Sequence, residues 1–587
     1  MKSREVPAAD HSAVTELRAL YGMMSRKRRR HLLGMLAMML VVAVAELVTI
    51  GLAVPFLSVV LAPGRAGAAP GRWALPLPSR GGSHLITAAL LFAGAGVAAA
   101  LARLLLVAIS QNFAFRLGHE LGTSMFSRML RQPYGHYVAR NTTELLLGME
   151  KVQVVVYSVL LPAIQGVSAA VLAVCITTLL FLIHPYAAAL GGVVMTAVYF
   201  SISLATRSRL RSNSAVLTGS ATARMKLVRE GLGGIRDILL DQSQEVFEDT
   251  FRQIDARYRR AQAANSLINT APRHIVESTA LILVAFVAVG VSYRQGGVVD
   301  ALPLLGAFAL GAQRLIPLLQ QVYAGWTQCL GNIHSLRDTL DLLRAPVVVS
   351  IPRSTTQPPL AFTRDIVIDD VSFRYGDGAH AVSGVSLRIP RGARVGVVGR
   401  SGGGKSTLLD LLMGLLEPTS GEIRVDGKLL DAVTRPHWQR QIAHVPQAIY
   451  LADRSIAANI AFGEADDRID MERMEAAARQ AEIHDFIMGL PDGFGTRVGE
   501  RGVQLSGGQR QRVGIARALY KRASLLIFDE VTSALDEATE VAVMRSISAI
   551  ESGRTVVIVT HRAANLDSCD LIIRMEQGRL VVSAPVG

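Results

Sequence analysis

The amino-acid sequence predicts a chain of two parts, in which a bundle of six membrane-spanning helices precedes an α/β domain with a phosphate-binding loop. Three observations give this prediction. Half of the 587 residues are hydrophobic, and the mean hydropathy is +0.34, a value that soluble domains seldom reach. The apolar residues gather into long runs in the first part of the chain. Beyond residue 364 the pattern changes to short β-branched strands between helices, and a glycine-rich loop follows one strand.

The apolar runs each approach or exceed the roughly 20 residues that a helix needs to cross a bilayer. The predicted spans are Leu32–Leu61, Leu85–Ile109, Val154–Ile183, Tyr186–Ala205, Ile275–Tyr293 and Val298–Gln320. Residues 1–30 are polar and end in five consecutive cations, but the run that follows is far longer than the core of a secretory signal. We therefore interpret 1–30 as a cytoplasmic segment, within which residues 13–24 can form an amphipathic helix on the membrane surface.

The net charge of +14 is distributed in a way that orients these spans. Arginines crowd the loops 114–151 and 207–273, whereas the alternate loops hold few, so the N-terminus, both long loops and the C-terminal domain are predicted to be cytoplasmic. Charge beside apolar spans favours contact with anionic lipid, and no nucleic-acid partner is expected. The two long loops should continue the spans as helices, with reversals near Pro133–Gly135 and 213–222, where short helices could touch the C-terminal domain.

The predicted domains are a membrane domain at 31–345, a linker at 346–363 and an α/β domain at 364–587. The linker assignment rests on four prolines between Pro346 and Pro359. The three cysteines, Cys175, Cys329 and Cys569, are far apart and form no CxxC pair. Neither a disulfide framework nor a zinc site is therefore implied.

A phosphate-binding loop is predicted at Gly399–Thr407, because it follows the apolar strand 394–398 and opens a helix. Its glycines let backbone N–H groups turn toward an anion, Lys405 reaches the outer phosphates, and the Ser406 hydroxyl can bind Mg²⁺. The alternative, a glycine-rich turn without a ligand, is disfavoured by the order of strand, loop and helix. The predicted nucleotide-binding residues here are Gly399, Ser401, Gly402, Gly403, Gly404, Lys405, Ser406 and Thr407.

Two acids, Asp529 and Glu530, end the apolar strand Leu525–Phe528. A carboxylate at that position can hold Mg²⁺ directly or through water, and the next one can polarise the attacking water as a general base. Buried structural acids are the alternative, and the distance from the phosphate loop argues against it.

From about 365 to 580 the chain resembles the nucleotide-binding domain of ABC transporters, with six motifs in the family's order. The resemblance implies that Tyr375 stacks on adenine, that Gln447 senses Mg²⁺ and the membrane domain, and that His561 contacts the γ-phosphate. It also implies a signature that closes over ATP bound by the opposite subunit, made of Ser506, Gly507, Gly508 and Gln509. The short loop found before the signature in exporters is matched by 499–502, and an interface-crossing loop holds Ser533 and Asp536. Val531 departs from the alanine that the family usually has.

Six spans fused ahead of one ATPase domain resemble exporters of the type I (type IV) ABC fold. The implied cofactors are ATP and Mg²⁺. One chain carries one phosphate loop and one signature, so two chains are needed for a closed site; a homodimer is expected, with a heterodimer as the alternative. ATP binding would close the domains and hydrolysis would release them, alternating inward and outward cavities.

A narrower resemblance links the chain to bacterial flippases for lipid-linked oligosaccharides. It rests on Glu46–Leu57, Glu230–Asp237, Pro272–Arg273 with Glu277, Arg314–Pro317 and Cys569–Asp570. It implies transfer of a polyprenyl-pyrophosphate glycan from the inner to the outer leaflet of a bacterial inner membrane. An exporter of drugs, lipids or peptides is the nearest rival. A regulatory or mechanical ATPase without transport, or a membrane receptor that uses the ATPase as a sensor, belongs to a different class, and the six spans argue against the former.

Two arginines are candidates for a substrate cavity, because charges inside spans are costly and usually face a cavity. Arg103 lies near the inner edge of the second predicted span and Arg314 in the cytoplasmic half of the last. Both could meet a pyrophosphate drawn from the inner leaflet. The alternatives are that Arg103 reaches back to the interface and that Arg314 pairs with an acid on another helix, such as Glu46 or Glu277.

Overall fold

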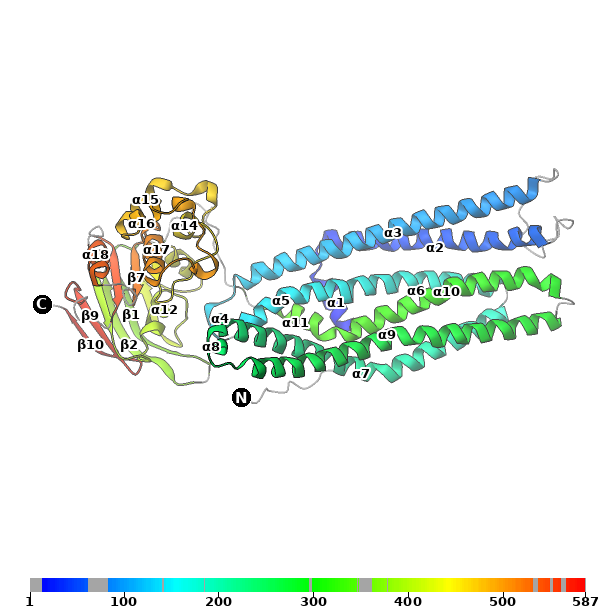
Figure 1. Ribbon diagram of the computed structural model, residues 1–587, viewed down its shortest axis with the longest axis horizontal. Helices are drawn as coiled ribbons and strands as arrows, with labels where there is room; N and C mark the ends of the chain where they lie inside the picture. The colour runs from blue at the N-terminus through cyan, green and yellow to red at the C-terminus, as the bar shows by residue number, and fades with distance from the viewer. Residues whose placement is uncertain are drawn as a thin grey trace. The chain divides into compact units, whose positions relative to one another are not determined.

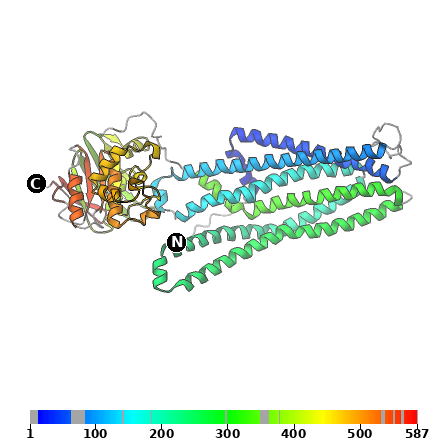
Figure 2. The same ribbon diagram turned by 45° about the horizontal axis from the view of Figure 1, so that its top comes forward.

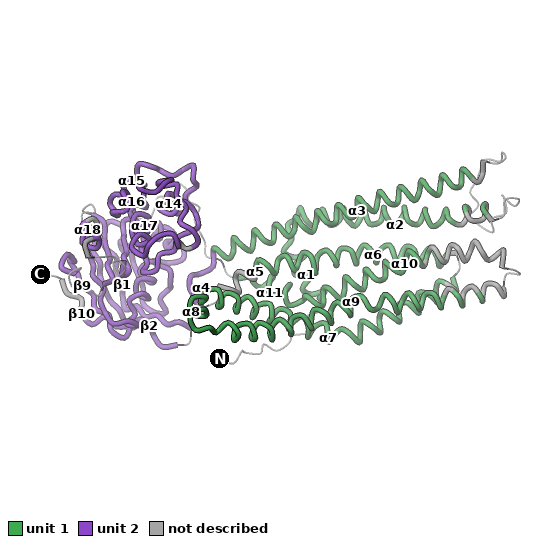
Figure 3. Tube along the Cα trace, viewed as in Figure 1, with its two compact units in different colours: residues 1–130, 140–345 green, residues 131–139, 346–587 purple. Residues whose placement is uncertain are grey.

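The computed structural model describes residues 13–61, 83–139, 142–183, 185–294, 298–345, 347, 360, 362–376, 378–531, 537–548, 553–560 and 566–585. The chain divides into two compact units (Figure 3). The helical unit comprises 1–130 and 140–345, and the sheet unit comprises 131–139 and 346–587. Each unit is described by itself below.

The helical unit is a bundle of long helices lying side by side (Figure 1). Its elements are α1 (Ala13–Met23), α2 (Arg26–Leu61), α3 (Ser83–Met129), α5 (Thr142–Val155), a π-helical turn (Val156–Leu160), α6 (Leu161–Ile183), α7 (Pro185–Gly233), α8 (Ile235–Leu240), α9 (Gln244–Arg294), α10 (Val298–Gly331) and α11 (Ile333–Arg344).

Four helices among the described residues are long and apolar enough to cross a membrane: Arg26–Ala53, Ile86–Met129, Gly148–Leu182 and Ala188–Gly233. They coincide with the first four predicted spans. The fifth and sixth predicted spans lie on α9 and α10, where some of the side chains fall outside the described residues. The helices also extend well beyond a membrane's thickness, since α7 has 49 residues and α9 has 51.

The two long loops reverse at short helices. The first, α4 (Tyr134–Ala139), begins inside the predicted reversal and belongs to the sheet unit. The second prediction was wrong: residues 213–222 lie inside α7, and the chain turns at Gly234–Ser243 around α8. Two consecutive glycines at 233–234 weaken the helix there, whereas the single Gly219 is tolerated in α7.

A close backbone contact joins α6 and α10. A Cβ atom built on Gly325 would lie 2.5 Å from the carbonyl oxygen of Pro162 and 3.2 Å from the Cα atom of Gly166. The contact falls just after the π-helical turn, whose Val159 carbonyl lies 3.6 Å from the buried Cys329 thiol. Glycine at 325 is therefore required for this crossing of the two helices.

The sheet unit contains two sheets (Figures 1 and 2). An antiparallel sheet has the order β2-β1-β4-β5, formed by His380–Pro390, Asp365–Arg374, Ser420–Val425 and Lys428–Leu429. A mostly parallel sheet has the order β10-β9-β3-β8-β7-β6, formed by Arg579–Pro585, Leu571–Glu576, Arg394–Val398, Thr555–Val559, Leu525–Asp529 and Ile442–Val445.

Helices complete the sheet unit around these strands. They are α12 (Lys405–Leu412), α13 (Arg435–Gln439), α14 (Ile456–Ile460), α15 (Met471–Gln480), α16 (His484–Met488), α17 (Gly507–Tyr520) and α18 (Glu537–Ser548), with 3₁₀ turns at Asp466–Arg468, Gly493–Gly495 and Glu500–Gly502. Strands β3, β8 and β7 are buried and apolar, as expected for a parallel sheet covered on both faces.

The parallel register places the ends of four strands at one edge. Val397 pairs with Val559, Asp529 also pairs with Val559, and Val445 pairs with Phe528. The phosphate loop, the two acids and the segment holding Gln447 each follow one of these strands. The carboxyl ends of parallel strands are where α/β folds bind ligands, so the topology gathers the predicted site residues there.

Candidate nucleotide-binding site

The phosphate loop adopts a backbone conformation that strongly favours glycine at three positions. Gly399, Gly402 and Gly404 have φ angles of +153°, +77° and +94°. A Cβ at Gly399 would lie 2.1 Å from the carbonyl oxygen of Met575, and one at Gly404 would lie 2.5 Å from that of Ala381. Because these obstacles are backbone atoms, a larger residue could not be accommodated without moving the neighbouring strands.

Lys405 is folded over this loop. It begins α12, is 8% exposed, and donates from Nζ to the carbonyl oxygens of Gly399 (2.7 Å) and Arg400 (3.1 Å). The adjoining Ser406 is exposed. A buried ammonium that donates to two backbone carbonyls at the mouth of a glycine loop fits an anion, because phosphate oxygens would give it stronger, charge-assisted partners.

Tyr375 lies beside the loop. Its hydroxyl is 3.5 Å from the Thr407 hydroxyl, and its ring meets that of Phe373 edge to face with a centroid distance of 4.9 Å. The ring remains 42% exposed. An exposed aromatic face next to a phosphate cradle can stack on a base, which is the role predicted for Tyr375.

The acids at the end of β7 occupy different environments. Burial, together with the neighbouring Glu530, raises the pKa of Asp529, while Lys405 opposes this shift. Glu530 has a left-handed backbone (φ +50°), its N–H donates to the Val559 carbonyl at 3.1 Å, and its Oε2 accepts from Gln447 Nε2 at 2.7 Å. The structure therefore brings together two residues, Gln447 and Glu530, that are 83 positions apart.

Mg²⁺ fits the donors at this edge. Within the described residues, no group of three or more His, Cys, Asp or Glu side chains could hold a metal ion by itself. Mg²⁺ keeps waters and phosphate oxygens and needs one or two protein ligands. A cation would also relieve the repulsion that raises the Asp529 pKa. Ser406, Asp529 and Gln447 are the residues that would hold it, and the ion would neutralise phosphate charge.

The predicted signature forms the start of α17. Ser506 is its N-cap and makes a reciprocal capping box with Gln509: Gln509 N–H donates to Ser506 Oγ at 3.2 Å, and Ser506 N–H donates to Gln509 Oε1 at 2.8 Å. Ser506 is exposed, with Gly507 and Gly508 following it in the first turn. A 14-residue helix thus presents its positive end at the surface.

Three predicted residues, Ser533, Asp536 and His561, lie outside the described residues. Their predicted roles stay predictions.

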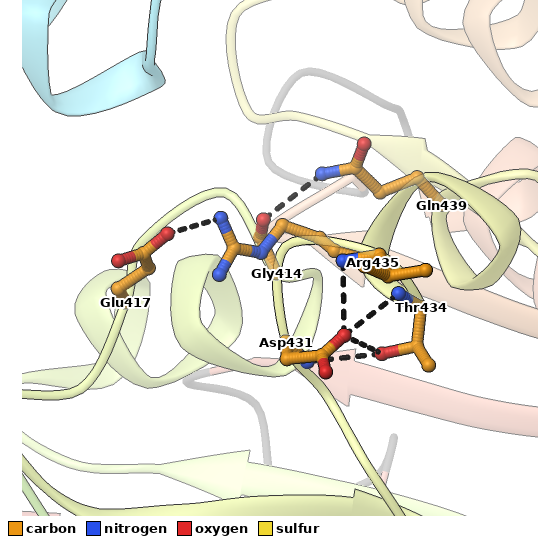
Figure 4. Close-up of polar contacts among 7 residues, drawn as sticks. Gly414, Glu417, Asp431, Thr434, Arg435 and Gln439 are labelled. Carbon is orange, nitrogen blue, oxygen red and sulfur yellow. Dashed lines mark hydrogen bonds and ion pairs between the residues drawn. The ribbon is translucent and has the colours of Figure 1, made fainter. Parts of the chain in front are cut away.

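Polar contacts surround the start of α13 and the segment that follows α12 (Figure 4). Asp431 accepts from the N–H and hydroxyl of Thr434 at 2.9 and 3.0 Å, Arg435 pairs with Glu417 at 2.5 Å, and Gln439 donates to the Gly414 carbonyl at 2.9 Å. The buried Trp438 donates from its indole to the Leu412 carbonyl at 2.8 Å. The bond from Trp438 satisfies the last carbonyl of the helix that carries Lys405, and the bond from Gln439 satisfies a carbonyl just beyond it.

One residue near the nucleotide site, Asp410, was not predicted from the sequence. Asp410 lies on α12, three residues beyond the phosphate loop, and its pKa is raised to about 6 by burial and then by Asp529. It also raises the pKa of Tyr134 on α4, for which burial is the larger cause. The one signal in the sequence was an acid in an apolar helix, Leu408-Leu409-Asp410-Leu411-Leu412, whose neighbours could not be inferred from local pattern.

In the helical unit, Arg103 and Arg314 share one carboxylate. Glu46 on α2 is 2% exposed; Arg103 Nη2 on α3 pairs with its Oε1, and Arg314 Nη1 on α10 lies 3.7 Å from its Oε2. The side chains of Arg103 and Arg314 remain 45% and 44% exposed. The ion pair with another helix, one of the two alternatives for Arg314, is therefore present, and it leaves an excess of one positive charge. Glu277 pairs instead with Arg273 at 2.7 Å.

Comparison with known proteins agrees with this geometry. Residues 31–308 match the ABC transporter transmembrane region, and residues 382–533 match the ABC transporter family. The ATP-dependent lipid A-core flippase of Cupriavidus metallidurans is 31% identical over 477 residues, covering 78% of this chain and 77% of that protein. The β-(1→2)-glucan export ATP-binding/permease protein NdvA of Rhizobium meliloti is 31% identical over 509 residues, covering 84% of each.

Among solved structures, a bacterial Atm1-family ABC exporter with ATP bound superposes with a TM-score of 0.76 at 25% identity, covering 95% of each chain. The helical unit and the sheet unit thus correspond to the transmembrane and nucleotide-binding parts of an exporter fold. The chain belongs to the ABC transporter family and is an ATP-hydrolysing membrane exporter whose transmembrane and ATPase domains are fused in one polypeptide.

Proposed function

We propose that this exporter is a flippase that moves a polyprenyl-pyrophosphate-linked oligosaccharide from the inner to the outer leaflet of a bacterial inner membrane. The observation that carries the proposal is the cluster of Glu46, Arg103 and Arg314. Two guanidinium groups against one carboxylate leave a net positive charge within the apolar runs of three helices. Such charges are costly in a membrane unless they serve a pathway.

The chemistry of the cluster selects an anionic head group. Guanidinium is planar, remains charged, and offers paired donors that match phosphate oxygens. The arginine side chains are nearly half exposed while Glu46 is buried, so the accessible part of the cluster is cationic. A lipid-linked pyrophosphate would supply both the anion and the tail that keeps the molecule in the bilayer.

The relatives point toward the same kind of cargo. One is named for a lipid A-core and another for a β-(1→2)-glucan. A lipid-linked oligosaccharide combines a lipid and a saccharide. A multidrug or peptide exporter of the same fold is the competing proposal, and nothing about a neutral drug would use two arginines.

The cargo proposal is tested in proteoliposomes by ATP hydrolysis and by the movement of a fluorescent lipid-linked glycan. We expect the lipid-linked glycan to stimulate hydrolysis and to cross the bilayer with ATP, whereas drugs and peptides do not stimulate it. Arg314→Ala should raise the concentration of glycan that gives half-maximal stimulation by roughly tenfold, as expected when one charge-assisted contact is lost. Arg252→Ala, an exposed arginine on α9, is the matched control and should change nothing. Stimulation by drugs in place of the glycan would refute the proposal.

We also propose that the working unit is a homodimer with two sites, each formed by the phosphate loop of one chain and the signature of the other. Two observations support this proposal. The positive end of α17 is exposed at Ser506, and each chain has one phosphate loop and one signature. Backbone N–H groups at that end would complete an anion site across a dimer interface. A heterodimer with a related chain is the competing arrangement.

Complementation tests the dimer. Lys405→Ala removes the phosphate-loop cation and Ser506→Ala alters the signature, so each homodimer should lose hydrolysis. Co-expression gives mixed dimers in which one site carries both defects and the other carries none. Hydrolysis should return to about a quarter of the wild-type rate if chains mix at random and sites act independently. Without recovery, each chain would have to supply both halves of its own site.

A further inference from the structure

The basic run at 26–30 divides into two sets with different surroundings. Arg28 and Arg29 are half-buried and bonded within the bundle: Arg28 pairs with Glu120 on α3 at 2.6 Å, and Arg29 donates to the Gly22 carbonyl at 2.7 Å and covers the Tyr21 ring at 4.9 Å. Arg26, Lys27 and Arg30 are exposed, and among the described residues none of the three makes an ion pair or side-chain hydrogen bond. The structure uses two cations of the run and leaves three facing outward.

The helix before this run also has an outward apolar edge. On α1, Val14 is 58% exposed, Tyr21 43% and Met23 40%, and Arg18 is exposed between them. The inward face carries Ala13, Glu16 and Leu20, which are all buried. Apolar side chains flanked by cations, at the point where α2 enters its apolar run, form the surface of a helix that lies at the boundary between head groups and acyl chains.

We propose that Arg18, Arg26, Lys27 and Arg30 bind anionic phospholipid head groups of the inner leaflet, and that this contact raises the rate of ATP hydrolysis. Charge complementarity selects the occupant. Within residues 13–31 the acid present is Glu16, which is buried and paired with Arg337 at 3.2 Å, and the nearby Glu120 is taken by Arg28. Among the described residues, the four exposed cations therefore have no acid to neutralise them, and the inner leaflet supplies anionic groups.

The Glu16–Arg337 pair gives the contact a route to the rest of the protein. Arg337 lies on α11, whose buried face is formed by Ile333, Leu336, Thr339, Leu340 and Leu343. This helix is the last of the helical unit, and the chain continues from it into the segment that leads to the ATPase domain. Head groups that hold α1 at the membrane surface would therefore bias the position of α11 through an ion pair whose acid is buried.

Vesicles of phosphatidylcholine with increasing phosphatidylglycerol test the proposal on the full chain. We expect ATP hydrolysis to rise with the anionic fraction and the rise to weaken with salt. Arg26→Gln/Lys27→Gln/Arg30→Gln should abolish the dependence of hydrolysis on the anionic fraction. Arg26→Lys/Arg30→Lys keeps both charges and should retain this dependence. Each cation near an anionic surface is worth about fivefold in binding, so the triple variant should bind fluorescent phosphatidylglycerol on the order of a hundredfold more weakly. Inorganic phosphate should not compete at matched ionic strength.

A matched control removes the same charge elsewhere. Arg252→Gln/Arg257→Gln/Arg260→Gln neutralises three exposed cations on α9, at least ~20 Å along the helix from the predicted fifth span, which is beyond the screening length at 0.1 M salt. This variant should respond to phosphatidylglycerol like the wild type. Equal loss in both variants would show a general charge effect and overturn the proposal, as would a wild-type rate that ignores the anionic fraction.

The route through α11 has its own test. Glu16→Gln should keep the binding of fluorescent phosphatidylglycerol but lose the stimulation of hydrolysis, and the exchange Glu16→Arg/Arg337→Glu should recover part of it. Retained binding shows that α1 is folded in the single variant. Undiminished stimulation in Glu16→Gln would overturn transmission through this pair. Because these readouts use no cargo, their failure is distinguishable from failure of the flippase proposal.

Discussion

Gly325→Ala offers a direct test of how α6 and α10 are held together. The added Cβ would lie 2.5 Å from the Pro162 carbonyl oxygen, 3.2 Å from the Gly166 Cα atom and 3.3 Å from the Pro162 carbonyl carbon. All three obstacles are backbone atoms, so no side-chain rotation can relieve them. Because non-bonded carbon contacts are favourable near 3.5–4.0 Å, the helices would have to separate by about 1 Å.

The loss of stability caused by this separation can be compared with a control substitution that should increase stability. Overpacking of this kind costs about 1–3 kcal/mol, and we expect the upper half of that range because α6 and α10 pack closely along their length. Gly192→Ala on α7 makes the same chemical change where the added Cβ meets nothing within 4 Å. There the gain in helix propensity should stabilise the chain by about 0.5–1 kcal/mol. Gly166→Ala, whose nearest contact would be 3.5 Å, should fall between them.

The assay is heat treatment of the detergent-solubilised protein at one scan rate, followed by measurement of the fraction that stays soluble and monodisperse. A fixed scan rate is needed because large membrane proteins unfold irreversibly. The midpoint should fall for Gly325→Ala, stay close to wild type for Gly166→Ala, and rise slightly for Gly192→Ala. A midpoint for Gly325→Ala equal to that of Gly192→Ala would refute the required glycine contact.

Three further predictions concern the ATP site. Glu530→Gln should lower ATP turnover by about 10²–10⁴-fold while ATP remains bound, as expected for loss of a general base; Glu475→Gln on α15 is the control, and normal turnover would remove Glu530 from that role. Lys405→Ala should abolish the thermal stabilisation that ATP gives the protein, and a preserved shift would contradict the phosphate role of this lysine. Asp410→Asn should stabilise the chain at pH 7.5 by about 1 kcal/mol, after allowance for partial exposure. The sign follows because the pKa of Asp410 is raised to about 6, so its protonated form favours folding. The ionised carboxylate therefore lowers the free energy of unfolding increasingly from pH 4 to 6, and by a constant amount at higher pH. A wild-type stability that rises between pH 4 and 6 would contradict this prediction.

The features that sequence predicted best are those encoded in consecutive residues. Length and apolar composition located the membrane helices, and strand, glycine loop and helix in succession located the phosphate cradle. The second reversal was misplaced, because residues 213–222 continue α7 and a helix with exposed polar side chains does not differ from a loop in local polarity. The breaker was the glycine pair at 233–234.

Contacts between side chains that are far apart in the sequence could not be predicted from local sequence pattern. Gln447 meets Glu530 because β6 and β7 are neighbours in the sheet, and strand order is set by tertiary packing. The pKa of Asp410 is raised to about 6 by burial and then by Asp529, and neither its burial nor the nearness of Asp529 can be inferred from adjacent residues. Similarly, the sequence indicated Glu46 as one of two acids that could pair with Arg314. It could not indicate that Arg103 shares the same carboxylate, because this sharing depends on how α2, α3 and α10 pack together.

The sharing of Glu46 implies different tasks for its two arginines. Arg314 lies 3.7 Å from the carboxylate, beyond hydrogen-bond distance, so its donors are available to a cargo phosphate, whereas Arg103 is paired directly. Removing the direct partner leaves a buried carboxylate poorly compensated, and breaking a buried pair costs about 3–5 kcal/mol, less here because the arginines are half exposed. Arg103→Ala should therefore lower the thermal midpoint, and Arg103→Ala/Glu46→Gln should recover much of it by removing the stranded charge. Arg314→Ala should affect chiefly the affinity for the lipid-linked glycan. If Arg314→Ala destabilised the protein as much as Arg103→Ala, and Glu46→Gln rescued both alike, the cluster would be a structural ion pair and the cargo role of Arg314 would be wrong.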